Sequence, residues 1–116
     1  MAHILIVDDS HDDQELMKEF LTSLNHTFIV ASSGEEALKI ISNQHFDLII
    51  TDYHMSEGDG VWLIERLKKI SHSPRCLLVT GEFGLSADYF LTIGASGFSY
   101  KPIIWSKLEA EIKRLI

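Results

Sequence analysis

Short apolar runs alternate with amphipathic segments along the whole chain. The runs lack a strict polar alternation, which is typical of strands buried on both faces of a sheet. They cover residues 3–7, 27–31, 46–51, 75–79 and 97–100. Between them, large apolar residues recur every three or four positions, as on one face of a helix. This second pattern predicts helices at residues 10–25, 33–41, 61–70, 85–93 and 104–116.

Five predicted strands therefore alternate with five predicted helices. Such alternation requires parallel strands joined by right-handed crossovers, with helices on both faces of one sheet. The 116 residues are enough for one domain with one core. We therefore predict a doubly wound α/β domain of three layers.

Composition and charge exclude some functions. The net charge of −7 and the lack of a basic patch argue against direct binding of nucleic acid. No apolar run approaches the roughly 18 residues that span a membrane, and the first residues lack the basic region of a signal peptide. The single cysteine, Cys76, lies in an apolar run and is interpreted as a buried, unreactive thiol. Together these features favour a cytoplasmic protein.

The central apolar run, residues 46–51, is followed directly by Asp52. The segment from Asp52 to Gly60 is polar and contains glycine, so it is predicted to be a loop. Ligands of open parallel sheets bind at the carboxyl ends of the strands. An isolated aspartate at this position would be interpreted as a turn or helix-cap residue. The residues at the other strand ends favour a chemical role instead.

Four other polar residues follow predicted strands. Asp8 and Asp9 follow the first strand, Thr80 the fourth and Lys101 the fifth. If strands one, three, four and five are neighbours in the sheet, the side chains converge, and a cluster of carboxylates needs a cation. Oxygen ligands without histidine or cysteine suit Mg²⁺. Asp52 is then a candidate nucleophile toward phosphorus, with Lys101 as a second cation and the Thr80 hydroxyl as a donor.

These motifs resemble, over essentially the full length, the receiver domain of bacterial two-component response regulators. No single motif is specific, but five of them occur in the right order after the right strands. The matching residues are Asp8-Asp9, Asp52, the loop residues Met55 and Asp59-Gly60, Thr80-Gly81 and Lys101-Pro102. The resemblance implies that residues 1–116 form one receiver domain. It also implies a flavodoxin-like sandwich with the strand order 2-1-3-4-5.

The resemblance assigns a role to each site residue. Asp52 would accept the phosphoryl group, and Thr80 and Lys101 would contact it. Mg²⁺ would be held by Asp9 directly, by Asp8 mainly through water and by Asp52. The backbone carbonyl of His54 would complete the protein ligands. In this family the peptide bond between the matching lysine and proline is usually cis.

Phe98 stands where the family has its switch aromatic, three positions before the lysine. The resemblance implies that Thr80 moves toward the phosphoryl group and lets Phe98 turn inward. The fourth helix, fifth strand and fifth helix would then present a changed surface. The chain would be a monomer, or a weak dimer that associates through this surface. Plain core packing is the alternative role of Phe98.

The implied function is phosphorylation-controlled signalling. A histidine kinase or a histidine phosphotransfer protein would donate to Asp52, and the domain would then bind a protein target or regulate an output domain. The chain would catalyse only its own phosphorylation and dephosphorylation. One alternative is a haloacid-dehalogenase-like Mg²⁺-dependent phosphatase, whose nucleophile ends the first strand. Another is a receiver used only as a scaffold. The sequence leaves open whether this receiver stands alone or belongs to a larger protein.

Some positions depart from the family pattern or border its site. Ser56 replaces the usual proline and Gly58 the usual methionine or leucine, so we expect a more mobile loop after Asp52. His54 and Glu82, each two residues after a site residue, are candidates for tuning the lifetime of the phosphorylated state. Exposure to solvent without a role is the alternative for both.

Overall fold

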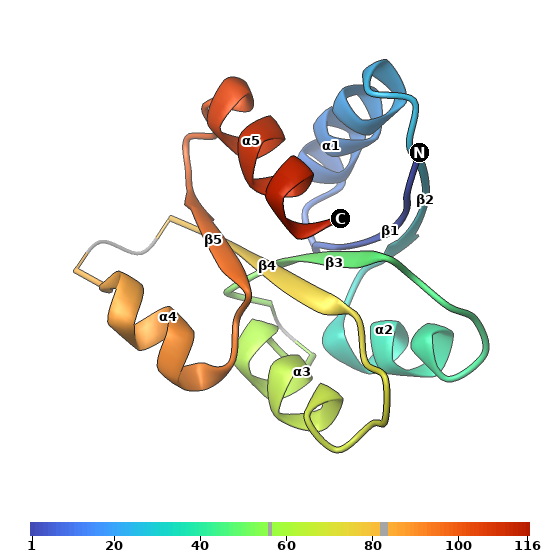
Figure 1. Cartoon of the computed structure of the whole chain (residues 1–116), viewed down its shortest axis with the longest axis vertical. Helices are drawn as coiled ribbons and strands as arrows, with labels where there is room; N and C mark the ends of the chain where they lie inside the picture. Colours follow the sequence, from blue (N-terminus) through green and yellow to red (C-terminus); the bar gives the residue numbers. More distant parts are fainter. Residues whose placement is uncertain (56, 82–83) are drawn as a thin grey trace.

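The computed structural model describes residues 1–55, 57–81 and 84–116, and these form one α/β sandwich (Figure 1). The strands are β1 (His3–Val7), β2 (Thr27–Ala31), β3 (Leu48–Asp52), β4 (Arg75–Thr80) and β5 (Gly97–Tyr100). The helices are α1 (His11–Ser23), α2 (Gly34–Ile41), α3 (Gly60–Leu67), α4 (Ala87–Ile93) and α5 (Trp105–Leu115). Strands and helices alternate strictly, as predicted.

All neighbouring strands of the sheet are parallel, in the order β2-β1-β3-β4-β5. The predicted doubly wound fold and its strand order are thus confirmed. The register pairs Val7 with Thr51 and Asp52 with Val79, and it pairs Thr80 with Tyr100. The carboxyl ends of β1, β3, β4 and β5 therefore lie side by side at one edge.

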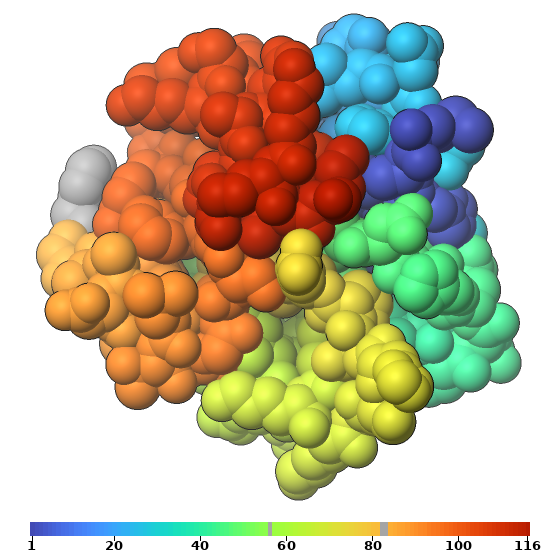
Figure 2. Space-filling view, in the orientation of Figure 1, coloured from blue at the N-terminus to red at the C-terminus, as the bar shows by residue number. Residues whose placement is uncertain are grey.

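Two apolar clusters lie on the two faces of the sheet, because alternate residues of each buried strand point to opposite sides. On one face Leu78 packs with residues of α2, α3 and α4, including Leu63 and Phe90. On the other face Ile50 packs with residues of α1 and α5, such as Leu21 and Leu108. In the space-filling view the red atoms of α5 cover the sheet on this side (Figure 2).

Side-chain caps fix where several helices begin. Ser33 accepts a hydrogen bond from the backbone N–H of Glu36 (3.1 Å) and so caps the N-terminus of α2. Asp59 accepts one from Trp62 (2.9 Å), so α3 begins at Gly60 and ends at Leu67, three residues before the predicted end. Ser86 caps α4, which begins two residues later than predicted. These differences lie within the usual uncertainty of helix ends.

Within the described residues, no helix has both the length and the apolar character needed to cross a membrane. Cys76 is buried, and this burial raises the pKa of its thiol to about 12. A thiol with so high a pKa is almost never a thiolate at neutral pH. The interpretation of Cys76 as an unreactive core residue is confirmed.

Candidate phosphoacceptor site

The predicted site residues converge at the carboxyl edge of the sheet. Asp8 follows β1, Asp52 is the last residue of β3, Thr80 is the last of β4, and Lys101 follows β5. The parallel register brings these positions together, although they are far apart in the sequence. The predicted convergence is thus present in the structure.

Asp8, Asp9 and Asp52 form a cluster of carboxylates. One ligand atom from each lies within 4.8 Å of the others. Asp8 is buried, Asp52 half-buried and Asp9 exposed. Ligand oxygens around an octahedral Mg²⁺ lie about 3 to 4 Å apart, so small side-chain movements bring these three oxygens into range. The donor set fits Mg²⁺, since it consists of hard oxygen ligands open to solvent on one side.

Lys101 is the cation of this cluster. Its Nζ atom lies 3.3 Å from Oδ2 of Asp52 and 3.9 Å from Oδ2 of Asp8. A third carboxylate, that of Asp13 in the first turn of α1, is closer still at 3.0 Å. The peptide bond between Lys101 and Pro102 is cis, as the resemblance implied.

The electrostatics of the site follow from burial and from these neighbours. Burial raises the pKa of Asp8 to about 6, and the charges of Asp52 and Asp13 add to the rise, while the Ser10 N–H and Lys101 oppose it. Burial also raises the pKa of Asp52, against the opposing effect of Lys101. Both carboxyl groups are therefore destabilised as anions, which is the condition that favours a bound cation.

The pKa of Lys101 shifts in the direction that keeps it charged. Burial lowers this pKa, but the hydrogen bond to Asp13 and the charges of Asp52 and Asp8 raise it by more. The ammonium group is therefore present at neutral pH. It is available to stabilise negative charge that develops next to Asp52.

Two contacts from the N-cap and first turns of α1 hold the side chain and the backbone carbonyl of Asp8. The N–H of Ser10 donates to Oδ1 of Asp8 (2.9 Å), and Nε2 of Gln14 donates to the Asp8 carbonyl (2.6 Å). Gln14 is itself buried. The sequence analysis did not single out Gln14. The one feature of the sequence that could have indicated its contact with Asp8 is its position one turn into α1.

Thr80 and Phe98 lie on neighbouring strands, β4 and β5, with Phe98 paired to Leu78. Thr80 is fully buried and Phe98 half-buried. The Phe98 ring stacks on Phe90 of α4, with 4.7 Å between centroids and 23° between planes. Phe98 thus contributes to core packing between β5 and α4. Its role as a switch remains a prediction.

Tyr100 is a further aromatic residue beside Thr80. The sequence analysis did not single out Tyr100. It pairs with Thr80 across β4 and β5. Its hydroxyl donates to the backbone carbonyl of Leu85 (2.9 Å), which joins β5 to the segment before α4. Its ring lies 5.5 Å from that of Phe98. These two contacts link the segment before α4 to both aromatic rings.

The loop after Asp52 is held by backbone contacts with α2. Gly58 has a left-handed conformation (φ 81°), and its carbonyl accepts a hydrogen bond from the N–H of Gly34 (2.8 Å). A Cβ atom at Gly34 would lie 2.3 Å from the Gly58 oxygen. The missing apolar anchor at Gly58 thus reflects a backbone conformation that glycine favours. Greater mobility of the loop remains a prediction, and Ser56 lies outside the described residues.

Of the two residues predicted to tune the phosphoryl lifetime, His54 lies within the described part of the chain. His54 is exposed, and its ring packs edge-on against Tyr53 with 4.7 Å between centroids. The roles of its side chain in tuning and of its carbonyl as a Mg²⁺ ligand remain predictions. Glu82 lies outside the described residues.

A narrow pocket reaches the site from the side of α1 and α5. It has about 20 Å³ of free volume, close to that of one water molecule. Polar lining comes from Asp8, Asp13, Asp52 and Lys101. Leu16 lines both this pocket and a neighbouring apolar one that contains Phe20 and Trp105. The Trp105 and Phe20 rings lie 4.8 Å apart, so Trp105 packs between the helices as a half-buried residue.

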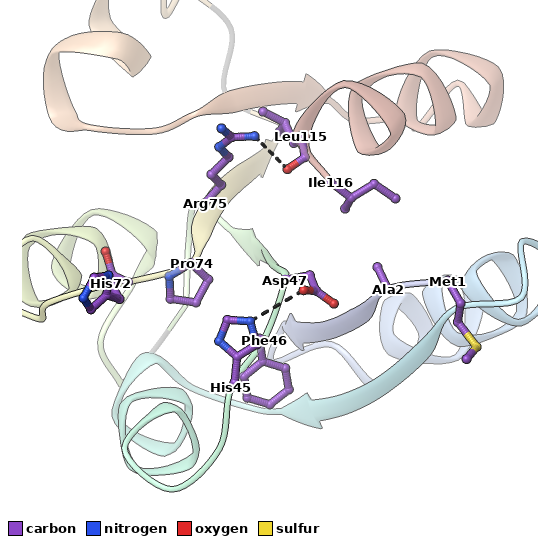
Figure 3. A pocket seen from close by; sticks show the side chains of 11 residues that line it. Met1, Ala2, His45, Phe46, Asp47, His72, Pro74, Arg75, Leu115 and Ile116 are labelled. Atoms are coloured by element: carbon purple, nitrogen blue, oxygen red, sulfur yellow. Dashed lines mark hydrogen bonds and ion pairs between the residues drawn. The ribbon is translucent and has the colours of Figure 1, made fainter.

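A larger cavity, of about 480 Å³, lies at the opposite edge of the sheet (Figure 3). It is lined by residues that precede β1, β3 and β4 and by the end of α5. Two of its polar contacts join residues within it: His45 lies 3.6 Å from Asp47, and Arg75 donates to the Leu115 carbonyl (3.2 Å). This cavity contains none of the predicted site residues and is separate from the carboxylate cluster.

The comparisons with known proteins agree with this geometry. Residues 4–113 match the sequence model of the response regulator receiver domain. Over 114 residues the chain is 35% identical to a probable transcriptional regulator, ycf27, of Cyanidium caldarium. It is 27% identical to the transcriptional regulatory protein ZraR of Escherichia coli. These matches cover 98% and 97% of this chain but only 46% and 26% of the relatives.

Solved structures show the same fold. The signal receiver domain of a histidine kinase from Syntrophus aciditrophicus is 32% identical, with a TM-score of 0.89, and the match covers 99% of this chain and 89% of that one. The response regulator TrrA of Thermotoga maritima, solved with Mg²⁺ and beryllium fluoride, is 28% identical. Its TM-score is 0.89, and both chains are covered completely. These findings give no support to the phosphatase or scaffold alternatives. The chain belongs to the response regulator receiver domain family.

Proposed function

We propose that Asp52 accepts a phosphoryl group in a Mg²⁺-dependent reaction and thereby controls a signalling surface. The observation that carries this proposal is the position of Asp52. Its carboxylate forms a cluster with those of Asp8 and Asp9, and the ammonium group of Lys101 lies 3.3 Å from it. A nucleophilic oxygen next to both a metal-binding cluster and a cation is suited to attack on phosphorus.

The reaction transfers a phosphoryl group from the nitrogen of a phosphohistidine, on a histidine kinase or a histidine phosphotransfer protein. A carboxylate oxygen of Asp52 forms the new P–O bond, the P–N bond breaks, and the imidazole leaves with the electron pair. Mg²⁺, when bound, neutralises charge on the phosphoryl oxygens. Asp8, Asp9, Asp52 and the His54 carbonyl would hold it.

Lys101 and Thr80 bind the phosphoryl oxygens. The Lys101 ammonium stabilises a phosphoryl oxygen, and the Thr80 hydroxyl donates a hydrogen bond to another. The same groups stabilise the in-line attack of water that later removes the phosphoryl group. Catalysis is thus confined to the chain's own phosphorylation and dephosphorylation.

The output would be a change in the surface formed by α4, β5 and α5. Movement of Thr80 toward the phosphoryl group would open space for Phe98, whose ring now packs on Phe90. Exposed apolar side chains occur on these elements or next to them, including Leu91, Tyr100 and Ile104. We propose that this surface binds a protein target or output domain and supports at most a weak dimer. Residues 1–116 would act as one receiver domain, in the cytoplasm.

Intact-mass spectrometry tests the proposed acceptor. Acetyl phosphate with Mg²⁺ should add one phosphoryl group to the wild type and none to Asp52→Asn. Asp47→Asn, an exposed aspartate before β3, is the matched control and should behave as wild type. Equal labelling of Asp52→Asn and wild type would place the acceptor elsewhere.

A further inference from the structure

Among the residues that the structure describes, Lys101 is shared by three carboxylates, and the shortest of these contacts goes to a residue outside the family motif. Nζ of Lys101 lies 3.0 Å from Oδ2 of Asp13, against 3.3 Å for Asp52 and 3.9 Å for Asp8. Asp13 is 88 residues away in sequence, in the first turn of α1. A carboxylate in the first turn interacts favourably with the helix dipole. That interaction does not require the contact with Lys101.

The Asp13 carboxylate is in a different environment from that of Asp52. Its side chain is 40% exposed, whereas that of Asp52 is 12% exposed. An exposed carboxylate that loses its partner is solvated by water, so releasing it costs little. Release of Lys101 from Asp52, whose side chain is only 12% exposed, would leave a poorly solvated anion without compensation. Asp13 is therefore the partner that Lys101 can exchange most readily for a new anion.

We propose that Asp13 is a positioning residue that holds Lys101 in the unphosphorylated chain and competes with the phosphoryl group for it. This inference rests on the proposed function of Asp52. The phosphoryl group adds negative charge next to Asp52, where Lys101 is needed. Asp13 opposes phosphorylation in two ways, because it withholds the ammonium group and because its own charge repels the incoming phosphoryl group.

The matched control is the neighbouring residue Asp12. Asp12 is also an exposed aspartate of the first turn of α1, so Asp12→Asn removes the same charge from the same helix end. Asp13→Glu keeps the charge and can still reach Lys101. Effects on the helix alone should be equal in Asp12→Asn and Asp13→Asn. Effects that pass through Lys101 should appear only in Asp13→Asn.

The first readout requires neither metal nor phosphoryl donor. In EDTA, the rate at which an amine reagent labels Lys101 is measured by peptide mass spectrometry, with Lys18 as the internal reference. We expect Asp13→Asn to raise the ratio of Lys101 to Lys18 labelling by about twofold or more, because one hydrogen-bond acceptor is removed. Asp12→Asn and Asp13→Glu should keep the wild-type ratio. An unchanged ratio in Asp13→Asn contradicts the proposal that Asp13 holds Lys101.

The second readout is the rate of phosphorylation by acetyl phosphate at saturating Mg²⁺. We expect Asp13→Asn to react about threefold to fivefold faster than Asp12→Asn, the scale of one surface ion pair. An increase below about twofold, or a decrease, contradicts the competition. If the wild type accepts no phosphoryl group, the proposed function itself fails, and the labelling experiment still decides whether Asp13 holds Lys101.

Discussion

Nζ of Lys101 lies 3.3 Å from Oδ2 of Asp52, although the two residues are 49 positions apart. Asp52 ends β3 and Lys101 follows β5, with β4 between them in the sheet. The long lysine side chain therefore reaches across the end of β4, next to Thr80. The parallel order of these three strands brings the two side chains together, and under the proposed function the contact places a cation next to the carboxylate that would attack phosphorus.

Lys101→Met should destabilise the metal-free protein. The substitution keeps an apolar stem but leaves the carboxylates of Asp8, Asp13 and Asp52 without their shared cation. We expect the free energy of unfolding to fall by about 1 to 2 kcal/mol at pH 7.5 in EDTA. Urea unfolding measures this change. Lys18→Met, which removes an exposed pair with Glu15, is the control and should cost about 0.5 kcal/mol or less. Equal losses in the two variants would contradict a special role for Lys101 in the cluster.

Asp8→Asn should stabilise the metal-free protein, and the gain should depend on pH. The pKa of Asp8 is raised from about 3.8 to about 6 in the folded chain, mainly by burial. Between these values the folded state keeps the proton that the unfolded state loses, so the wild type loses stability as pH rises. The full shift corresponds to at most about 3 kcal/mol.

The difference in unfolding free energy between Asp8→Asn and wild type is the quantity to measure. In EDTA it should be near zero at pH 4, increase through pH 6 and level off above about pH 7. Mg²⁺ should reduce it, because the metal stabilises ionised Asp8 only in the wild type. Asp12→Asn should give a difference that changes little over the same range. If the difference for Asp8→Asn does not change with pH, the pKa of Asp8 is not raised in the folded chain.

Asp9→Ala should weaken Mg²⁺ binding, since it removes one of the three clustered ligands. Loss of a ligand typically costs tenfold or more in affinity, and isothermal titration calorimetry or fluorescence titration with Mg²⁺ measures it. Removing Asp9 should also raise the melting temperature in EDTA, because one repelling charge is gone. Wild-type Mg²⁺ affinity in this variant would exclude Asp9 as a ligand.

His54 and Glu82 should set the lifetime of the phosphorylated state more than the rate of its formation. In the proposed mechanism Mg²⁺, Thr80 and Lys101 stabilise both reactions, so access of the attacking water is the property left to neighbouring side chains. A tenfold change in lifetime requires about 1.4 kcal/mol, the scale of one or two hydrogen bonds. Decay rates of phosphorylated His54→Ala and Glu82→Ala in excess Mg²⁺ test this. Rates within about twofold of wild type in both would make these residues bystanders.

The fold was predictable because each strand is an uninterrupted apolar run and each helix has one apolar face. The site was predictable because parallel strands place their carboxyl ends at one edge, so residues after different runs had to meet. Asp13 was not recognised as a site residue. Its contact with Lys101 depends on how the first turn of α1 lies relative to the residue that follows β5, and the local pattern records only a first-turn aspartate.

Gly58 and Tyr100 show the same limit. Gly58 was interpreted as a departure from the family's methionine or leucine that makes the loop more mobile. Its left-handed backbone and its contact with Gly34 involve a loop and a helix 24 residues apart. Tyr100 was part of a predicted strand, and its hydrogen bond to Leu85 could not be read from strand periodicity. Contacts made by a single hydroxyl or carbonyl leave no periodic signal in the sequence.

Localisation of the phosphoryl group is the measurement that tests the central claim most directly. The wild type is treated with acetyl phosphate and Mg²⁺, and borohydride then reduces the acyl phosphate, which converts the acceptor aspartate to homoserine. Peptide mass spectrometry should find homoserine at position 52, with unmodified aspartate at positions 8, 9 and 13. Labelling should be lost in EDTA. Homoserine at any of those other positions, with Asp52 unmodified, would contradict the proposed function.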